Sequence, residues 1–137
     1  MTIKLESVSL DDAQRVIAAA QAKAAEIESP SNVAVVDVGA NLVAHVRMDN
    51  AWAGSIDISI NKAFTARAFD IATKDLAANA QPGEQFFGIH GSNQGRVMIF
   101  AGGIPLLRGG AVVGAVGVSG GSGEQDQAIA EAAAAAF

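Results

Sequence analysis

The segment NVAVVDVGANLVAHVRMD, residues 32–49, determines the expected fold. Two runs rich in β-branched residues flank Gly39-Ala40-Asn41, an arrangement typical of a β-hairpin. Side chains alternate along a strand, so the second run has two distinct faces. One face is apolar and is expected in the core: Leu42, Ala44, Val46 and Met48. The other face consists of Val43, His45, Arg47 and Asp49. Its last three residues are the only cluster of charged or metal-ligating side chains on a predicted strand.

Helices are predicted on both sides of this hairpin. The sequence that starts at Ser9 is close to a capping box, and apolar residues recur behind it at helical spacing as far as Pro30. This pattern predicts an amphipathic helix over roughly 9–28. Ser55 can cap a second helix over about 55–79, and its apolar face is wide enough to be buried on more than one side.

The second half of the chain predicts three further strands and a helix. After a polar, glycine-rich loop at 80–95, we expect three strands: RVMIFA at 96–101, LLR at 106–108 and AVVGAVGVS at 111–119. A turn GGIP at 102–105 and a tight turn at Gly109-Gly110 separate these strands. An alanine-rich helix follows from about 123. Hairpin connections dominate. The sequence therefore predicts one α+β domain over residues 1–137, with an antiparallel five-stranded sheet flanked by helices in the order α-β-β-α-β-β-β-α.

The glycine-rich stretch GVSGGSGEQDQ, residues 117–127, resembles a phosphate-binding loop in outline. A P-loop requires a lysine after its last glycine, and none is present. A dinucleotide fingerprint requires a glycine where Asp126 stands. Ser122 and Gln125 instead have the spacing of a capping box, which favours a structural use of the glycines. The alternative is a small ligand other than a polyphosphate that contacts the backbone N–H groups around 119–121.

The composition excludes several classes of protein. Half of the residues are hydrophobic and only 17% are charged, against about 25% in an average protein, so we expect burial between subunits of a homo-oligomer. The net charge is −5 with nine Lys plus Arg, which argues against nucleic acid as a partner. The absence of cysteine excludes disulfides, thiol nucleophiles and Fe–S clusters. We expect no membrane span and a cytoplasmic location, because no long apolar run or signal core is present.

Several motifs together resemble a known family. They are RMD at 47–49, KAFTA at 62–66, GGIP at 102–105, VGAVGVSGG at 113–121 and EQDQ at 124–127. In this order they are similar to the GlcG/HbpS-like family, which includes the C-terminal domain of some corrinoid adenosyltransferases. The resemblance implies an antiparallel sheet flanked by helices and assembly into dimers or larger homo-oligomers. It also implies haem binding in some members, and in others an accessory place in glycolate, glycerol or diol catabolism.

Two histidines are the candidate haem ligands that this resemblance brings forward. His45 is the first candidate because it lies on the polar face of its strand beside Arg47. His90 lies in the long loop and is the weaker candidate. The alternative for each is an ordinary histidine, at the surface or an interface for His45 and in a solvated loop for His90. Their spacing matches no metal-binding motif.

A second candidate site is built around two cations. Arg47 can hold a carboxylate through two parallel hydrogen bonds, and Lys62 can add a second charge or, if desolvated, act as a base. We predict one ligand pocket with the following walls: Arg47, Lys62, Gly102, Gly103, Ser119 and Gly120. The structural alternative is an Arg47–Asp49 or interhelical ion pair that fixes the second helix on the sheet.

Three functions compete on these observations. The first is a small-ligand-binding protein, which binds haem or another planar cofactor and is accessory to small organic acid or diol metabolism. The second is a cofactor-independent lyase or isomerase that acts on a small organic acid through Arg47 and Lys62. The third is a scaffold with no ligand. Because none of the serines lies in a G-x-S-x-G nucleophile elbow, no serine hydrolase is expected.

Overall fold

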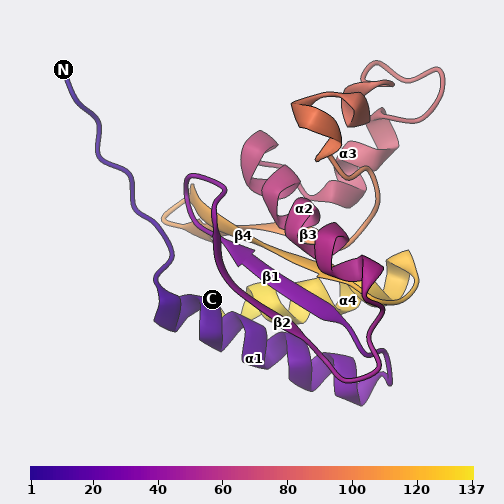
Figure 1. Cartoon of the computed structure of the whole chain (residues 1–137). Coiled ribbons are helices and arrows are strands. Elements are labelled where there is room, and N and C mark those ends of the chain that lie inside the picture. The colour runs from indigo at the N-terminus through magenta and orange to yellow at the C-terminus, as the bar shows by residue number, and fades with distance from the viewer.

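The structure is a computed structural model that describes residues 1–137. Its elements are α1 (Leu10–Glu26), β1 (Asn32–Val36), β2 (Leu42–Arg47), α2 (Gly54–Phe69), α3 (Thr73–Asn79), the 3₁₀ turns η1 (Ile89–Gly91) and η2 (Asn93–Gly95), β3 (Gly103–Arg108), β4 (Ala111–Ser119) and α4 (Gly123–Ala135). Helices α1 and α4 cover one face of the sheet, and α2 crosses the other face (Figure 1). None of the helices is long and apolar enough to cross a lipid bilayer.

The sheet has four antiparallel strands in the order β2-β1-β4-β3. The hairpin predicted at 32–49 is confirmed as β1 and β2, with Ala34 opposite His45. Alternation divides β1 between two cores, because Val33 and Val35 face α1 and α4, while Ala34 and Val36 face α2. His45 therefore projects from the same face of the sheet as α2.

The prediction of five strands is wrong at RVMIFA, residues 96–101, which forms no strand. Val97 of this run is almost inaccessible to solvent, whereas Phe100 is 45% exposed. Helix α2 supplies a hydrogen-bond acceptor that a neighbouring strand would otherwise provide, because the backbone N–H of Met98 donates to Thr65 Oγ1 at 2.9 Å. The turn expected at GGIP is also wrong in part, because β3 begins at Gly103 and includes Pro105.

The helix predicted over 55–79 is two helices. Helix α2 ends where Asp70 adopts the left-handed conformation, with φ 51° and ψ 46°. Aspartate tolerates this region better than most residues, and its carboxylate is also paired with Arg67 at 2.6 Å. Helix α3 starts again at Thr73, whose hydroxyl accepts a hydrogen bond from Gly103 N–H at 2.9 Å. The second helix is thus turned toward the start of β3.

The predicted helix boundaries at both ends of the chain are confirmed. Ser9 caps α1 and Ser122 caps α4, each through a complete capping box. Helix α2 lies unusually close to β4, because Gly117 presents no side chain to the helix backbone at Ala63. Two segments project from this body: the extended N-terminal residues before α1, and the loop at 80–95 beyond α3 (Figure 1).

Candidate functional site

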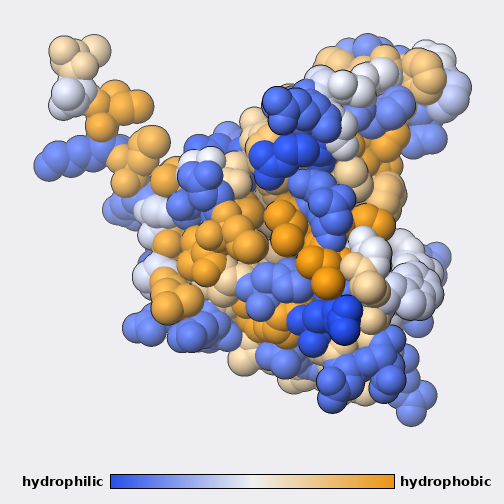
Figure 2. All heavy atoms as spheres, in the orientation of Figure 1, coloured by the Kyte–Doolittle hydropathy of each residue, from blue (hydrophilic) through white to orange (hydrophobic).

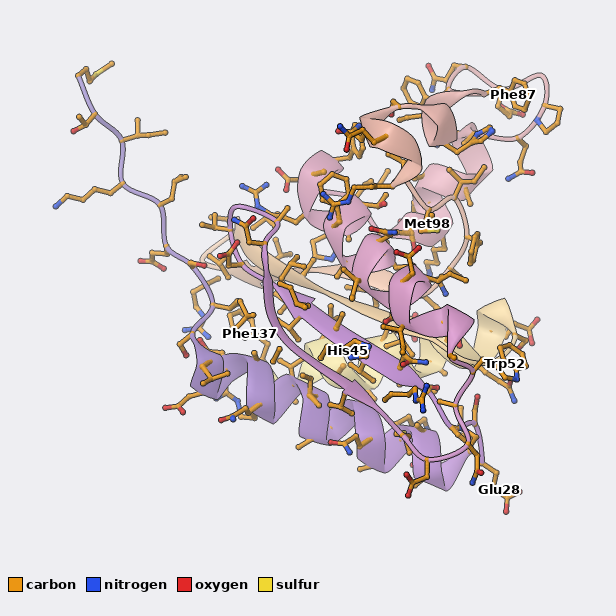
Figure 3. The ribbon with its side chains drawn as sticks, viewed as in Figure 1. Glu28, His45, Trp52, Phe87, Met98 and Phe137 are labelled. Atoms are coloured by element: carbon orange, nitrogen blue, oxygen red, sulfur yellow. The ribbon has the colours of Figure 1, made fainter.

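His45 lies in the middle of β2 on the face that α2 covers only in part. Figure 3 shows its imidazole at the junction between β2 and α2, and Figure 2 shows hydrophobic atoms gathered on this side of the molecule. The Nε2 atom is enclosed and has no hydrogen-bond partner. Burial lowers the pKa of His45 below its ordinary value of 6.5. The side chain is therefore a neutral imidazole at pH 7 whose Nε2 is unused by the fold.

His90 has a different environment, in the 3₁₀ turn η1 of the projecting loop. Its ring meets the ring of Phe87 edge to face, with 5.8 Å between the centroids. Both His90 and Phe87 are exposed, and the neighbouring Phe86 is exposed as well. The loop thus presents two aromatic rings and one accessible imidazole on a surface that the rest of the chain does not cover.

Arg47 lies at the end of β2 and has no ion-pair partner in the chain, so the Arg47–Asp49 pair of the structural alternative is not formed. Its side chain borders a cavity of about 430 Å³. Gln21 from α1 and Asp49 also line this cavity. The guanidinium is accordingly free to meet an anion from solvent.

Lys62 is fully buried in the middle of α2. Its ammonium group donates to Asp126 Oδ2 at 2.9 Å and to the carbonyl oxygen of Val118 at 2.8 Å. The same nitrogen lies 4.8 Å from the centre of the Phe100 ring, within the range of a cation–π contact. Two of the three N–H donors of the ammonium group are thus bound inside the fold, and the group also faces the Phe100 ring.

The partner of Lys62 is Asp126, in the first turn of α4. Burial lowers the pKa of Lys62 and raises the pKa of Asp126, and the opposite charge of each partner acts against the shift of the other. The carboxylate also accepts hydrogen bonds from the backbone N–H groups of Gly120 and Gly121. Asp126 thus occupies the place that a bound phosphate would take at a glycine-rich loop.

This arrangement explains the glycines at 119–123. The N–H groups of Gly120 and Gly121 bind Asp126, and that of Ser122 binds the Gln125 side chain at 2.9 Å. Ser119 is held by a hydroxyl–hydroxyl contact with Ser55 at 3.1 Å. The loop therefore closes on its own helix, and these three N–H groups are not available to an anion.

The structure brings most of the predicted second site together. Gly102 and Gly103 pack directly on Lys62, because a Cβ atom at Gly102 would lie 2.8 Å from its Nζ and one at Gly103 would lie 2.6 Å from its carbonyl oxygen. Ser119 and Gly120 follow the carbonyl of Val118 that Lys62 binds. Arg47 is not part of this group, and no cavity is lined by both cations.

Sequence reasoning did not identify Asp126 as the partner of Lys62. Asp126 was singled out only because it stands where a dinucleotide fingerprint requires a glycine. No group of three His, Cys, Asp or Glu side chains converges to hold a metal ion. A cofactor that already holds its metal ion within a macrocycle would need only one ligand from the chain.

Comparison with known proteins gives the family. The family model described as haem degrading protein HbpS-like matches residues 8–135, from the end of the extended arm to the last turn of α4. The chain belongs to the HbpS-like family. This confirms the resemblance found in the motifs, including the segments around Lys62 and the glycine-rich loop.

Relatives of this HbpS-like chain occur alone and as parts of larger proteins. An uncharacterized 15.0 kDa protein in the dhaT-dhaS intergenic region of Citrobacter freundii is 42% identical over 134 residues, which cover 98% of this chain and 94% of the relative. The corrinoid adenosyltransferase PduO of Citrobacter freundii is 38% identical over 131 residues, which cover 96% of this chain. That match covers only 39% of PduO, so the likeness concerns one part of the enzyme.

Several solved structures have the same fold as this chain. Protein ORFY of Klebsiella pneumoniae superposes with a TM-score of 0.97 at 40% identity, covering 99% of this chain and 94% of that one. A PduOC:heme complex gives a TM-score of 0.91 at 37% identity, covering 95% and 94%. A double mutant of Streptomyces reticuli HbpS gives a TM-score of 0.89 at 32% identity, covering 98% and 89%.

Proposed function

We propose that this HbpS-like protein binds haem. The observation that carries the proposal is the likeness to PduOC, which has been solved as a haem complex, at 37% identity over 95% of this chain. The family description, haem degrading protein HbpS-like, supports the same ligand. When bound, haem supplies an iron centre for electron transfer or for binding of small ligands.

The residues of this chain fit such a cofactor at His45. A histidine that ligates iron must be neutral, and burial favours that form of His45 at pH 7. Its Nε2 has no partner within the chain, so the fold does not compete for it. The hydrophobic surface at the β2–α2 junction (Figure 2) suits the apolar face of a porphyrin. His90 is the second candidate, because its ring is exposed beside Phe87.

Titration with haemin tests the proposal. We expect a saturable Soret band in the wild-type protein, and a shifted or weakened band when the ligating histidine is replaced by alanine. The variants His45→Ala and His90→Ala serve as controls for each other, because each removes one imidazole and leaves the other. A wild-type protein without a saturable Soret band would contradict haem binding. An unchanged spectrum in both variants would contradict ligation by either histidine.

A second candidate function is binding of a small carboxylic acid, favoured by the unpaired guanidinium of Arg47. The cavity that it borders is open to solvent and contains the amide of Gln21, which can donate to a second carboxylate oxygen. An accessory role in small organic acid or diol metabolism would fit such a ligand. The lyase or isomerase alternative loses its geometric support, because Lys62 is committed to Asp126 and does not line this cavity.

The substitution Arg47→Lys tests this second function. Lysine keeps the charge but cannot form the planar fork that holds both oxygens of a carboxylate. We expect small carboxylic acids to raise the melting temperature of the wild-type protein and to raise that of the variant less. Equal shifts in both proteins would contradict a role for Arg47.

A further inference from the structure

A cavity of about 460 Å³ lies at the end of the sheet where α1 ends and α2 and α4 begin. Three separate segments form its walls: the turn that contains Glu28 and Ser29, the segment from Asn50 to Trp52, and the glycine-rich loop before α4. Figure 3 shows Glu28 and Trp52 on this same side of the molecule. Neither haem-ligand candidate lines this cavity, nor does Arg47.

Trp52 is the only tryptophan of the chain, and it is 64% exposed. Its backbone is fixed, because its carbonyl oxygen accepts hydrogen bonds from Asn32 Nδ2 at 2.9 Å and from Ser55 N–H at 3.1 Å. The main chain thus holds the residue in place while the indole projects into solvent beside the cavity. A fixed backbone with a large exposed ring is what a stacking platform requires.

The polar side chains of the cavity are unused by the fold. Glu28, Ser29 and Asn50 make no side-chain hydrogen bond within the chain, although Ser29 is only 4% exposed. Gln125 uses its Oε1 for the cap of α4, and its amide NH₂ group has no partner. Together these groups offer hydroxyl, carboxylate and amide atoms that both donate and accept hydrogen bonds.

The backbone of the cavity is held in an uncommon conformation at two positions. Glu28 has φ 54° and Asn50 has φ 70°, and both values lie in the left-handed region. Asparagine tolerates this region. Glu28 adopts it at the end of α1, where the N–H groups of Glu28 and Ser29 donate to the carbonyl oxygens of Ala25 and Ala24 as in a Schellman cap. Glu28 and Asn50 aim two unpaired polar side chains from two different turns at one cavity.

The chemistry of the walls determines the class of ligand. No lysine or arginine lines the cavity, and Glu28 adds a negative charge. The N–H groups of the glycine wall are already bound to Asp126 and Gln125. Phosphates and carboxylates are therefore excluded, because the walls carry no positive charge and the N–H groups of Gly121 and Ser122 are already bound. A neutral ligand with several hydroxyl groups and one face that stacks on an indole matches every wall.

We infer that this cavity binds a neutral sugar ring, a free pyranose, with its C–H face stacked on Trp52. The C–H hydrogens of such a face carry partial positive charge and meet the negative face of the indole. The ring hydroxyls then reach Asn50, Ser29 and the Gln125 amide, whose hydrogen-bonding capacity is otherwise unused. A planar nucleobase would stack equally well but would leave most of these polar groups without partners. This site is separate from the haem site proposed above, and the two can be tested independently.

The fluorescence of Trp52 reports binding directly, because the chain has one tryptophan and no tyrosine. The probes are methyl α-D-glucopyranoside, methyl β-D-galactopyranoside and methyl α-D-mannopyranoside, with choline chloride and adenosine as competing chemistries. We expect at least one glycoside to shift the emission to the blue and to saturate with a Kd on the order of millimolar, as is usual for a small polar ligand in an open site. Asn50→Ala should weaken this binding about tenfold, because it removes one amide partner.

Two further variants separate the alternatives. Glu28→Gln keeps an acceptor but removes the charge, so binding of a neutral sugar should persist within about threefold. Trp52→Ala should abolish saturation-transfer NMR signals of the glycoside, whereas Phe69→Ala, at an exposed ring outside the cavity, should leave them unchanged. The inference is overturned if no glycoside saturates the emission, if choline or adenosine binds in preference, or if Trp52→Ala binds as well as the wild type while its circular dichroism is native.

Discussion

Lys62 Nζ lies 2.9 Å from Asp126 Oδ2, and this ion pair joins the middle of α2 to the first turn of α4 through the interior of the protein. Neither side chain is exposed by more than a few per cent. A third group completes the contact, because Lys62 also donates to the carbonyl oxygen of Val118 near the end of β4. Helix α2 therefore meets β4 and α4, which lie more than forty positions later in the sequence, at one ammonium group.

Breaking this pair should be strongly destabilising. Lys62→Met removes the cation and leaves Asp126 buried without its partner, which typically costs about 3–5 kcal/mol of the free energy of unfolding. Urea unfolding followed by circular dichroism measures the loss as a shift of the midpoint.

The double variant Lys62→Met with Asp126→Leu is the control for this first prediction. It removes both charges, so it should recover a substantial part of the stability that the single variant loses. A single variant within about 1 kcal/mol of the wild type would contradict a structural role for the pair.

Gly117 should also be sensitive to substitution, for a steric reason. A Cβ atom at this position would lie 2.5 Å from the backbone nitrogen of Ala63 and would also collide with the carbonyl oxygen of Ser59. Both contacts are with the backbone of α2, which cannot move aside as a side chain can. Gly117→Ala should therefore destabilise the protein by about 1–3 kcal/mol or more.

Gly54→Ala is the matched control for Gly117→Ala. Nothing lies within 4 Å of a Cβ atom at Gly54, at the start of α2. Alanine should be neutral there, or stabilising by about 0.4–1 kcal/mol, because it restricts the unfolded chain. Similar losses of thermal stability in both variants would show that the contact between β4 and α2 is not the cause.

The sequence predicted those parts of the fold in which local signals and tertiary packing agree. The capping boxes at Ser9 and Ser122 and the hairpin at 32–49 need only neighbouring residues, and the structure confirms each of them. The prediction of a strand at RVMIFA failed because a high β-propensity reflects how well side chains are buried, and it does not require pairing with a neighbouring strand. Thr65, which is 33 positions away from Met98, supplies the hydrogen bond that replaces a strand neighbour.

The remaining differences also depend on contacts that the sequence does not display. The break after α2 has no glycine or proline to mark it, and it depends on Asp70 in a left-handed conformation held by Arg67. The cluster of Lys62 with the glycines was predicted, but its partner Asp126 was not. Pairing of residues 64 positions apart requires knowledge of how α4 returns over the end of the sheet.

His45 should make the stability of the protein depend on pH. Its pKa is lowered in the folded state by burial, whereas the unfolded chain has the ordinary value of 6.5. Below pH 6.5 the unfolded chain therefore binds more protons than the folded protein, and stability falls as the pH falls toward the lower folded pKa. The contribution of the neutral His45 to the free energy of unfolding is fully present above pH 6.5.

The variant His45→Phe keeps a ring of similar size and removes the titration. Urea midpoints measured from about pH 8 to pH 5, the range in which histidine titrates, should fall for the wild type relative to the variant as the pH falls. The wild type loses this contribution, and the variant has none to lose. His90 is present in both proteins, so its titration cancels in the comparison. Parallel curves over the whole range would contradict the buried, neutral state of His45.

The last prediction is that the protein is a homo-oligomer and that the projecting loop is part of the interface. Phe86 and Phe87 are 46% and 59% exposed at its tip, and nothing else in the chain covers them. Aromatic rings of this kind are enriched in interface cores. Light scattering at low micromolar concentration should therefore give at least the mass of a dimer, and Phe87→Ser should shift the distribution toward the monomer. Gln85→Ser, a polar change in the same exposed loop, should leave the mass unchanged. A monomeric wild type would contradict assembly itself, whereas a Phe87→Ser variant with the wild-type mass would place the interface elsewhere on the molecule.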